Sequence, residues 1–372
     1  MIDYENLMKA NEPFANELEA AANRVTRSGW YVLGQEVQAF ETEFAQYVGG
    51  KYCVGVANGL DALAISLKAL ELPEGSEVLV ASNTYIATIL AILQAGLKPV
   101  LVEPDIQTYN IDPVRLPSAL NKGTRAICVT HLYGKSCRMD AVVAFAEAHG
   151  LMVIEDCAQS HGARFGEKTT GTFGIAGCFS FYPTKNLGAL GDAGAIITND
   201  ENFADQLRHW RNYGSKQKYV NVYPGVNSRL DEIQAAFLRV KLPHLDRITA
   251  HKRALASLYF ELLPKELTLP KIEADAFDVF HIFAIRHTAR DPLKAFLLER
   301  GIKTEVHYPT APHRQRAMRG VLAGEYPIAD EIHATELSLP ISFATTPDEV
   351  RAVCSTIRDF HAVSESAIRH AG

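Results

Sequence analysis

Short apolar runs alternate with longer amphipathic segments through the first half of the chain. The apolar runs predict strands. The segments between them predict helices, because their apolar residues recur every three or four positions. The predicted strands are 53–56, 77–80, 100–102, 126–130, 151–154, 178–181 and 195–198, and the predicted helices are 60–70, 86–93, 114–120 and 141–149. This order predicts an α/β fold with a mostly parallel sheet covered by helices.

The pattern changes after a helical stretch at 228–245. Beyond it we expect helices at 252–263, 292–300 and 347–361 and strands at 279–286 and 304–307, with a proline-punctuated link. We therefore predict two domains. Residues 1–246 would form a large α/β domain with an N-terminal helical segment, and residues 247–372 would form a smaller C-terminal α+β domain.

Four polar residues stand where strands of the predicted sheet end, namely Asn58, Asn83, His131 and Asp156. Ligands of such sheets bind beyond the carboxyl ends of the strands, where loops and helix N-termini converge. We therefore expect these four residues to outline a pocket.

The composition of the chain argues against several classes of binding partner. The 372 residues are 47% apolar, enough for a large core, and the net charge of -6 gives no general attraction to nucleic acid or an anionic membrane. No apolar run approaches the roughly 20 residues of a membrane helix, no leader pattern opens the chain, and the cysteines form no C-x-x-C pair. We expect a cytoplasmic protein that acts on small molecules, with neither nucleic acid nor a membrane as its partner.

Lys185 carries the most chemical information, because of its relation to Asp156. Asp156 ends an apolar run, and Lys185 lies in nearly uncharged, glycine-rich sequence that can bring backbone close to a ligand. A desolvated lysine could condense with the aldehyde of pyridoxal phosphate, while the aspartate keeps the pyridine nitrogen protonated. Taken singly, Lys185 could be a surface lysine and Asp156 a capping or salt-bridged acid.

Other residues suit the remaining groups of that cofactor. The segment Gly55-Val-Ala-Asn58-Gly59-Leu60-Asp61 joins a strand to a helix, and the free N–H groups of such a first turn favour a phosphate. Ser180 could donate its hydroxyl to the same phosphate, Gln159 could donate to the 3′ oxygen of the ring, and Tyr85 could stack on the ring face. An ordinary capped turn and a serine bonded to backbone are the structural alternatives.

Five motifs stand in order along nearly the whole chain: Asn58-Gly-Leu-Asp-Ala-Leu63, Asn83-Thr-Tyr-Ile-Ala-Thr88, Glu155-Asp-Cys-Ala-Gln-Ser-His-Gly-Ala163, Phe179-Ser-Phe-Tyr-Pro-Thr-Lys-Asn-Leu-Gly188 and Gly225-Val-Asn-Ser-Arg-Leu-Asp-Glu-Ile-Gln234. Together they resemble the pyridoxal-phosphate-dependent nucleotide-sugar aminotransferases of the DegT/StrS family. The resemblance implies a fold-type I, aspartate-aminotransferase-like homodimer with active sites at the subunit interface.

The resemblance also implies the cofactor contacts, position by position. Lys185 would form the Schiff base, Asp156 would pair with the pyridinium nitrogen, and Gln159 would contact the 3′ oxygen. The ring face and the phosphate would be held by Tyr85, Gly59, Leu60 and Ser180. Asn227, which could also simply cap a helix, would reach the phosphate from the other subunit. No metal site is predicted.

Within the family, the motifs are similar to those of the branch that aminates C-3 of a dTDP-linked 3-keto-6-deoxyhexose. L-glutamate would leave its amino group on the cofactor as pyridoxamine phosphate, and the sugar would take it up to give dTDP-3-amino-3,6-dideoxyhexose. That product would serve O-antigen lipopolysaccharide, S-layer, other glycan or natural-product synthesis. The sugar and nucleotide site would include Tyr182, Lys218, Tyr219, Tyr223, His307 and Tyr308. His307 and Tyr308 could equally pack a domain interface.

Some positions depart from the family pattern, and some functions compete with this one. Thr184 stands where the branch usually has glycine, Tyr85 where phenylalanine is common, and Lys135-Ser136 replaces a polar-small pair. Dehydrating relatives carry histidine in place of the lysine, and a nicotinamide oxidoreductase needs G-x-G-x-x-G after a strand. A non-catalytic regulator would normally add a DNA-binding module. A 4-keto dTDP or UDP sugar stays an alternative substrate.

Overall fold

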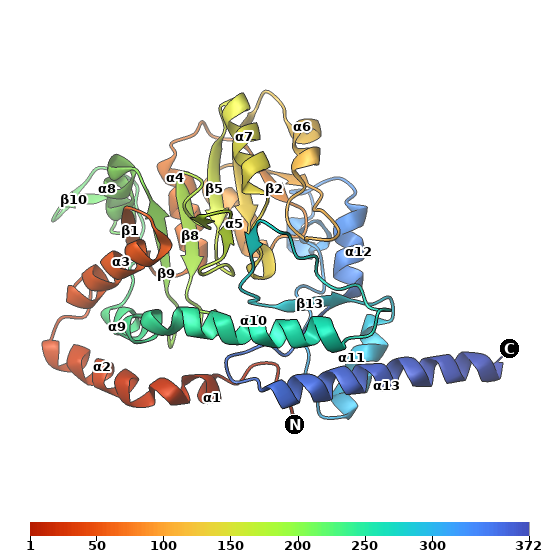
Figure 1. Cartoon of the computed structure of the whole chain (residues 1–372). Coiled ribbons are helices and arrows are strands. Elements are labelled where there is room, and N and C mark those ends of the chain that lie inside the picture. Colours follow the sequence, from red (N-terminus) through yellow and green to blue (C-terminus); the bar gives the residue numbers. More distant parts are fainter. Residues whose placement is uncertain (372) are drawn as a thin grey trace.

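The computed structural model describes residues 1–371, with side chains as far as Ala362, and is built around a seven-stranded sheet (Figure 1). The strand order is β1-β9-β8-β5-β4-β2-β3. β8, β5, β4, β2 and β3 run parallel, whereas β9 lies antiparallel between β1 and β8. The predicted mostly parallel α/β sheet is confirmed. Its strands are β1 Tyr52–Val56, β2 Glu77–Ala81, β3 Lys98–Val102, β4 Thr124–Thr130, β5 Met152–Asp156, β8 Ala176–Ser180 and β9 Gly194–Thr198.

Helices cover both faces of this sheet, because successive side chains of each strand point to opposite faces. Val78 and Val80 of β2 join one apolar core, and Leu79 and Ala81 join another on the opposite side. The first core is completed by α4 Gly59–Ala69, α5 Ile86–Gln94 and α8 Glu201–Trp210. The other face is covered by α3 Gln35–Val48, α6 Leu116–Ala119, α7 Met139–His149 and α9 Glu232–Lys241.

Several helices and strands that follow α9 share a separate apolar core. In it, the long helix α10 (Leu245–Leu262) packs on α13 (Pro347–Ala371), and α11 (Arg290–Glu299) packs beside the antiparallel pair β13 (Phe283–Arg286) and β14 (Glu336–Leu339). Figure 1 shows α10 passing below the sheet, with α13 beneath it. The domain boundary at residue 246 stays a prediction.

The N-terminal segment lies against these C-terminal elements. Ile2 forms a bridge with Ile302, and Phe14 stacks on Phe343 with ring centroids 6.1 Å apart. The segment contains α1 Leu7–Asn11, the 3₁₀ turn η1 Glu12–Phe14 and α2 Ala15–Ser28, which packs on α9. The start of the chain therefore contacts both α9, which covers the large sheet, and the elements that follow it.

Short elements complete the fold. They are β6 Arg164–Phe165, β7 Lys168–Thr169, β10 Ser215–Gln217, β11 Val220–Asn221, β12 Ala276–Phe277, α12 Pro327–Thr335 and the 3₁₀ turns η2 Pro113–Arg115, η3 Leu132–Gly134, η4 Leu242–His244, η5 Pro312–Arg314 and η6 Arg316–Met318. In the portion of the chain that the structure describes, no helix combines the length and the apolar character needed to cross a membrane.

Several predicted elements differ from the structure. The expected strand at 304–307 is a single bridge from Glu305 to Ser338, because the His307 N–H donates to the Glu336 carboxylate instead of a neighbouring strand. The helix expected from 228 begins only at Glu232, since the Ser228 N–H bonds to the carbonyl of Arg211. The helix expected at 252–263 already begins at Leu245, and helices α8 and α12 were not predicted from the sequence. The other predicted helices and strands differ from the structure at their ends.

Candidate active site

A cavity of about 540 Å³ lies at the carboxyl ends of β4, β5 and β8. Its polar walls come from loops and helix N-termini that follow these strands, as expected for a parallel sheet. Most of the predicted site residues line it, namely Gly59, Leu60, Tyr85, Asp156, Gln159, Ser180, Tyr182, Lys185, His307 and Tyr308. Residues from both ends of the sequence therefore meet around one space.

Lys185 enters the cavity from the turn that follows β8. Its backbone N–H donates to the carbonyl of Tyr182 at 2.8 Å, which closes the turn. Burial lowers the pKa of the Lys185 ammonium to about 8, and the carboxylate of Asp156 partly opposes that shift. A larger share of this lysine is the neutral, nucleophilic amine near neutral pH than of an exposed lysine.

The Asp156 carboxylate is held by two donors at the end of β5. Its Oδ2 accepts from the Thr88 hydroxyl at 2.8 Å, and its Oδ1 accepts from the Ala158 N–H at 3.1 Å. Burial raises the pKa of this carboxyl, while these two hydrogen bonds and the charge of Lys185 act against the increase. Asp156 is only 5% exposed, so its orientation is set by Thr88 and Ala158 rather than by water.

Thr88 belongs to a chain of buried hydroxyls. The Thr84 hydroxyl lies 2.8 Å from that of Thr88 and 2.8 Å from that of Thr130, which lines the cavity. This connects the end of β4 with the start of α5 and fixes the Thr88 side chain against Asp156. No role was predicted for Thr88, although it closes the motif Asn83–Thr88.

Gln159 has its amide orientation fixed by the backbone. Its Oε1 accepts from the Tyr133 N–H at 2.6 Å, so its Nε2 is the donor, and this atom lies 3.0 Å from the Tyr308 hydroxyl. Tyr133 takes a left-handed backbone conformation (φ 62°), which is costly for a residue with a side chain and here aims its N–H at Gln159. A donor at Nε2 is what the 3′ oxygen of the cofactor would require.

The first turn of α4 lies directly against Ser180. A Cβ atom on Gly59 would be 2.6 Å from the Cβ of Ser180, so only glycine allows this approach. The Asn58 side chain caps the helix by accepting from the Asp61 N–H at 2.8 Å, which confirms the capping alternative for Asn58. The remaining N–H groups of the turn have no partner within a helix, and with the helix dipole they suit a phosphate.

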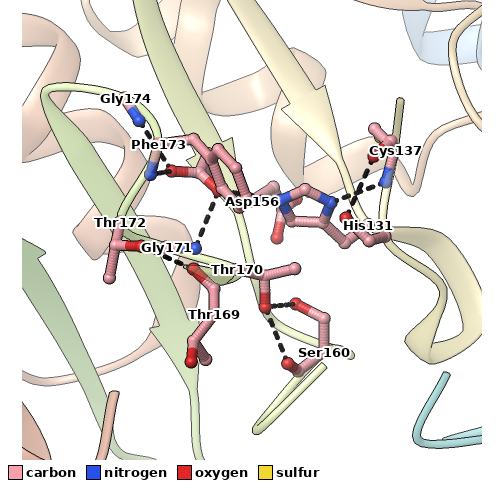
Figure 2. Close-up of polar contacts among 12 residues, drawn as sticks. His131, Cys137, Asp156, Ser160, Thr169, Thr170, Gly171, Thr172, Phe173 and Gly174 are labelled. Atoms are coloured by element: carbon pink, nitrogen blue, oxygen red, sulfur yellow. Dashed lines mark hydrogen bonds and ion pairs between the residues drawn. The ribbon is translucent and has the colours of Figure 1, made fainter. Parts of the chain in front are cut away.

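Two of the four residues expected to outline the pocket do not line it. Asn83 is buried and donates to the carbonyl of Tyr109 at 2.8 Å. His131 is also buried, and its Nδ1 accepts from the Cys137 N–H, so its Nε2 donates to Glu155 at 3.0 Å (Figure 2). Both side chains turn away from the cavity and hold neighbouring loops.

Glu155 anchors the loop that precedes β8. Its carboxylate accepts from His131 at 3.0 Å and from the N–H groups of Gly171, Phe173 and Gly174 at 2.7–2.8 Å. The Cys157 thiol lies close enough to these two side chains for a shared metal ion, but both oxygens of Glu155 are already taken by these donors. The two neighbouring acids of β5 therefore point to opposite faces of the sheet. Asp156 faces the cavity, and Glu155 binds the loop.

Four predicted contacts lie outside this cavity in the single chain. Asn227, Lys218 and Tyr219 are exposed to solvent, and the Tyr219 side chain is 86% exposed. Tyr223 stacks on Trp210 with ring centroids 5.7 Å apart. Their roles toward a second subunit stay predictions.

His161 and His281 lie near Lys185. His161 is fully buried against Phe179 and Phe181, which fits a packing role, and burial lowers its pKa to about 3. His281 lines the cavity, and no motif in the sequence pointed to it.

The sequence model of the DegT/DnrJ/EryC1/StrS aminotransferase family matches residues 14–358. The chain belongs to this family. It is 48% identical over 361 residues to the dTDP-3-amino-3,6-dideoxy-α-D-galactopyranose transaminase of Aneurinibacillus thermoaerophilus, covering 97% of this chain and 99% of the relative. It is 41% identical over 363 residues to the dTDP-3-amino-3,4,6-trideoxy-α-D-glucose transaminase of Streptomyces venezuelae, covering 96% of each.

Solved structures agree with this membership of the DegT/DnrJ/EryC1/StrS family. The crystal structure of S. venezuelae DesV in complex with a ketimine intermediate has a TM-score of 0.95 and 41% identity, covering 96% of this chain and 98% of DesV. The predicted family, the fold-type I architecture and the aminotransferase class are therefore confirmed. Aminotransferases of this family use pyridoxal phosphate, and the protein is a pyridoxal-phosphate-dependent sugar aminotransferase.

The residues around the cavity fit this cofactor. A lysine with a lowered pKa, a buried carboxylate and an amide donor surround the space that the ring would occupy. The turn of α4 against Ser180 supplies N–H and hydroxyl donors for the phosphate. Each functional group of pyridoxal phosphate therefore has a chemically matching partner in one cavity.

Proposed function

We propose that the enzyme transfers the amino group of L-glutamate to C-3 of a dTDP-linked 3-keto-6-deoxyhexose. The observation that carries the proposal is the convergence of Lys185, Asp156 and Gln159 with the α4 N-terminus around one cavity. The choice of carbon and nucleotide is supported by the names of the relatives from A. thermoaerophilus and S. venezuelae, both of which are transaminases of dTDP-linked 3-amino sugars.

Lys185 would act both as the attachment point and as the proton carrier. When bound, the cofactor supplies an aldehyde, an electron-accepting ring and storage of the amino group between the two half-reactions. The pKa of about 8 leaves the Lys185 amine able to attack that aldehyde and, once released, to move a proton at the substrate carbon. One residue would thus serve both half-reactions.

Asp156 and Gln159 would orient the ring from its two sides. The Asp156 carboxylate, held by Thr88 and Ala158, would face the pyridine nitrogen and keep it protonated. Gln159 would donate from Nε2 to the 3′ oxygen, because its Oε1 is occupied by the Tyr133 N–H. Tyr85 would cover one face of the ring.

The phosphate would lie at the start of α4. Gly59 and Leu60 would donate backbone N–H groups, and Ser180 would donate its hydroxyl. The sugar would lie on the open side of the cavity, near Tyr182, His307 and Tyr308. Tyr308 already contacts Tyr85, with ring centroids 4.8 Å apart, so the sugar and the cofactor would be neighbours.

A second copy of the chain would complete each site. Asn227 is exposed in the single chain, as a residue that serves the partner's phosphate should be, and Lys218, Tyr219 and Tyr223 precede it on the same segment. Large aromatic side chains are also exposed at Trp30, Tyr31 and Tyr213, as expected of a surface buried by association. We therefore propose a homodimer with shared active sites, working in the cytoplasm on precursors of glycans such as O-antigen.

A panel of substrates tests this proposal. The purified enzyme would be incubated with glutamate and each of four sugars, the 3-keto and 4-keto forms of dTDP-linked and UDP-linked deoxyhexoses, and the products identified by NMR. We expect a 3-amino product from the dTDP-linked 3-keto sugar. A 4-amino sugar as the sole product would show that the assignment to C-3 is wrong.

A further inference from the structure

A second group of buried polar atoms lies beside the cavity and outside the cofactor contacts. The His307 backbone N–H donates to Glu336 Oε2 at 2.7 Å, and its ring Nδ1 lies 2.8 Å from the Ser338 hydroxyl. The Ser338 hydroxyl is in turn hydrogen-bonded to Glu336 Oε1. Glu336 and Ser338 are fully buried and two residues apart on β14, so their side chains share one face of the strand. A carboxylate, a hydroxyl and an imidazole therefore form one chain that ends at the cavity.

Only one ring atom of His307 is left for a ligand. Burial, together with the charges of Lys185 and Lys294, lowers the pKa of His307 to about 4, so the ring is neutral and carries a single N–H. Nδ1 is engaged by Ser338, whereas no hydrogen bond joins Nε2 to any of the described side chains or backbone groups. Because His307 lines the cavity, Nε2 is the ring atom that a bound molecule can reach.

We propose that Glu336, acting through Ser338, determines which nitrogen of His307 carries the proton, and thereby whether Nε2 accepts or donates a hydrogen bond in the cavity. Glu336 and Ser338 are positioning residues in this role, because neither lines the cavity. The identity of the ligand as a keto sugar rests on the proposed function, whereas the proton arrangement does not.

Two proton arrangements satisfy every atom of the chain. With Glu336 ionised, the Ser338 hydroxyl donates to the carboxylate and accepts from Nδ1–H of His307, which leaves Nε2 as an acceptor. With Glu336 protonated, its Oε1–H donates to Ser338, whose own hydrogen turns to Nδ1, and the ring proton then moves to Nε2. In both arrangements Oε2 accepts from the His307 N–H. Protonation of Glu336 thus changes His307 Nε2 from a hydrogen-bond acceptor to a hydrogen-bond donor toward the ligand.

The groups around Glu336 bring its pKa close to the pH at which enzymes commonly work. Burial raises the pKa of Glu336 to about 8, and the hydrogen bonds from Ser338 and the His307 N–H limit the increase. The titratable and charged groups that face Glu336 from the elements packed around it are Arg290 and Lys294 of α11, Tyr4 of the N-terminal segment, and Tyr109, Tyr133 and Tyr308 from the loops near the cavity. The two cations favour the ionised form of Glu336.

The polarity of Nε2 would decide which part of the substrate faces His307. A ketone oxygen only accepts a hydrogen bond, an ammonium group only donates, and a hydroxyl can do either. A histidine locked with Nε2 as an acceptor would select a donor group of the sugar, and one locked as a donor would select an oxygen. Glu336 would therefore contribute to substrate specificity without touching the substrate.

NMR of the holoenzyme tests the proton arrangement directly. With ¹⁵N-labelled histidine, and with His307→Asn to identify the signal, the ring nitrogens report which one carries the proton. In the wild type we expect the proton to move from Nε2 to Nδ1 as the pH rises through about 8. Glu336→Gln should keep it on Nε2 at every pH, because the amide donates to Ser338 as the protonated acid does. Ser338→Ala should remove the pH dependence, and Ser338→Thr should restore it.

Kinetics give a second measurement. Below the pKa of Glu336, the KM for the keto sugar should differ from its value above by ~2- to 12-fold, the range for one neutral hydrogen bond, and this difference should vanish in Glu336→Gln. The rate of the glutamate half-reaction should not change in that variant, which shows that it is folded and loaded. The matched control is Glu305→Gln, an exposed acid opposite Ser338, which should behave as the wild type.

A wild-type proton position that stays the same across pH 8, or a wild-type pH response in Ser338→Ala or Glu336→Gln, would overturn the proposal. If none of the keto sugars is turned over, the proposed function fails, but the NMR result still decides the role of Glu336. The two failures are therefore distinguishable.

Discussion

Replacing Thr88 by valine should slow the reaction while leaving the fold in place. Thr88 is fully buried, and its hydroxyl donates to Asp156 Oδ2 at 2.8 Å. Valine has nearly the same shape, so the main loss is one hydrogen bond to a carboxylate. A hydrogen bond to a charged group contributes about 1.5–3 kcal/mol. If the ionised form of Asp156 is needed in the rate-limiting step, this corresponds to a roughly 10- to 150-fold loss in rate.

The glutamate half-reaction provides the assay, because the visible absorbance of the cofactor changes when its amino form appears. Thr88→Val should lower this rate, and Thr88→Ser, which keeps the hydroxyl, should recover most of it. Thr84→Val should cause a smaller loss, since its hydroxyl helps to orient Thr88 but does not bond to Asp156. A wild-type rate in Thr88→Val, or an equal loss in Thr84→Val, would refute the reasoning.

Four further predictions concern charge. In the apoenzyme, the reaction of Lys185 with pyridoxal phosphate should accelerate as the pH rises and level off above about 8, because only the neutral amine attacks. Asp156→Asn should move that midpoint to lower pH, since the carboxylate raises the pKa of Lys185; absorbance measures both. Glu155→Gln should lower the free energy of unfolding by about 1–3 kcal/mol in urea titration, because its amide hydrogens face backbone donors. Lys135→Met should lower that free energy by about 3–5 kcal/mol, since it leaves the buried Asp278 without its partner.

Matched variants distinguish these effects from a nonspecific loss of stability caused by any substitution. Glu299→Gln removes an exposed carboxylate and should not change the free energy of unfolding. Lys135→Met combined with Asp278→Leu should recover most of the loss, because no uncompensated charge is then buried. Equal destabilisation by the single and the double variant would contradict the role given to the ion pair.

The residues that could be predicted from the sequence were those whose chemistry follows from local position. Asp156 ends a strand and Lys185 follows the next one, so the topology of a parallel sheet already brings them to the same edge. Asn58 and Gly59 open a helix after β1, which is a recognisable phosphate-binding turn. The alternation of strands and helices is also a local pattern, so the large sheet could be predicted from the sequence as well.

The positioning residues could not be predicted, because they act across long sequence distances. Thr88 reaches Asp156 from a different strand–helix unit, and Glu336 reaches His307 from β14, contacts that no local pattern records. His131 was wrongly placed in the pocket, since a polar residue at a strand end can face a ligand or anchor a loop. Only the hydrogen bond to Glu155 distinguishes the two.

The central claim is that Lys185 carries the cofactor, and one chemical experiment addresses it directly. Borohydride reduction of the holoenzyme fixes a Schiff base permanently, and peptide mass spectrometry then identifies the labelled lysine. The test is demanding because Lys241 and Lys252 are also buried, with pKa values lowered to about 8. We predict the label on Lys185 alone; a label on Lys241 or Lys252, or none on Lys185, would contradict this account.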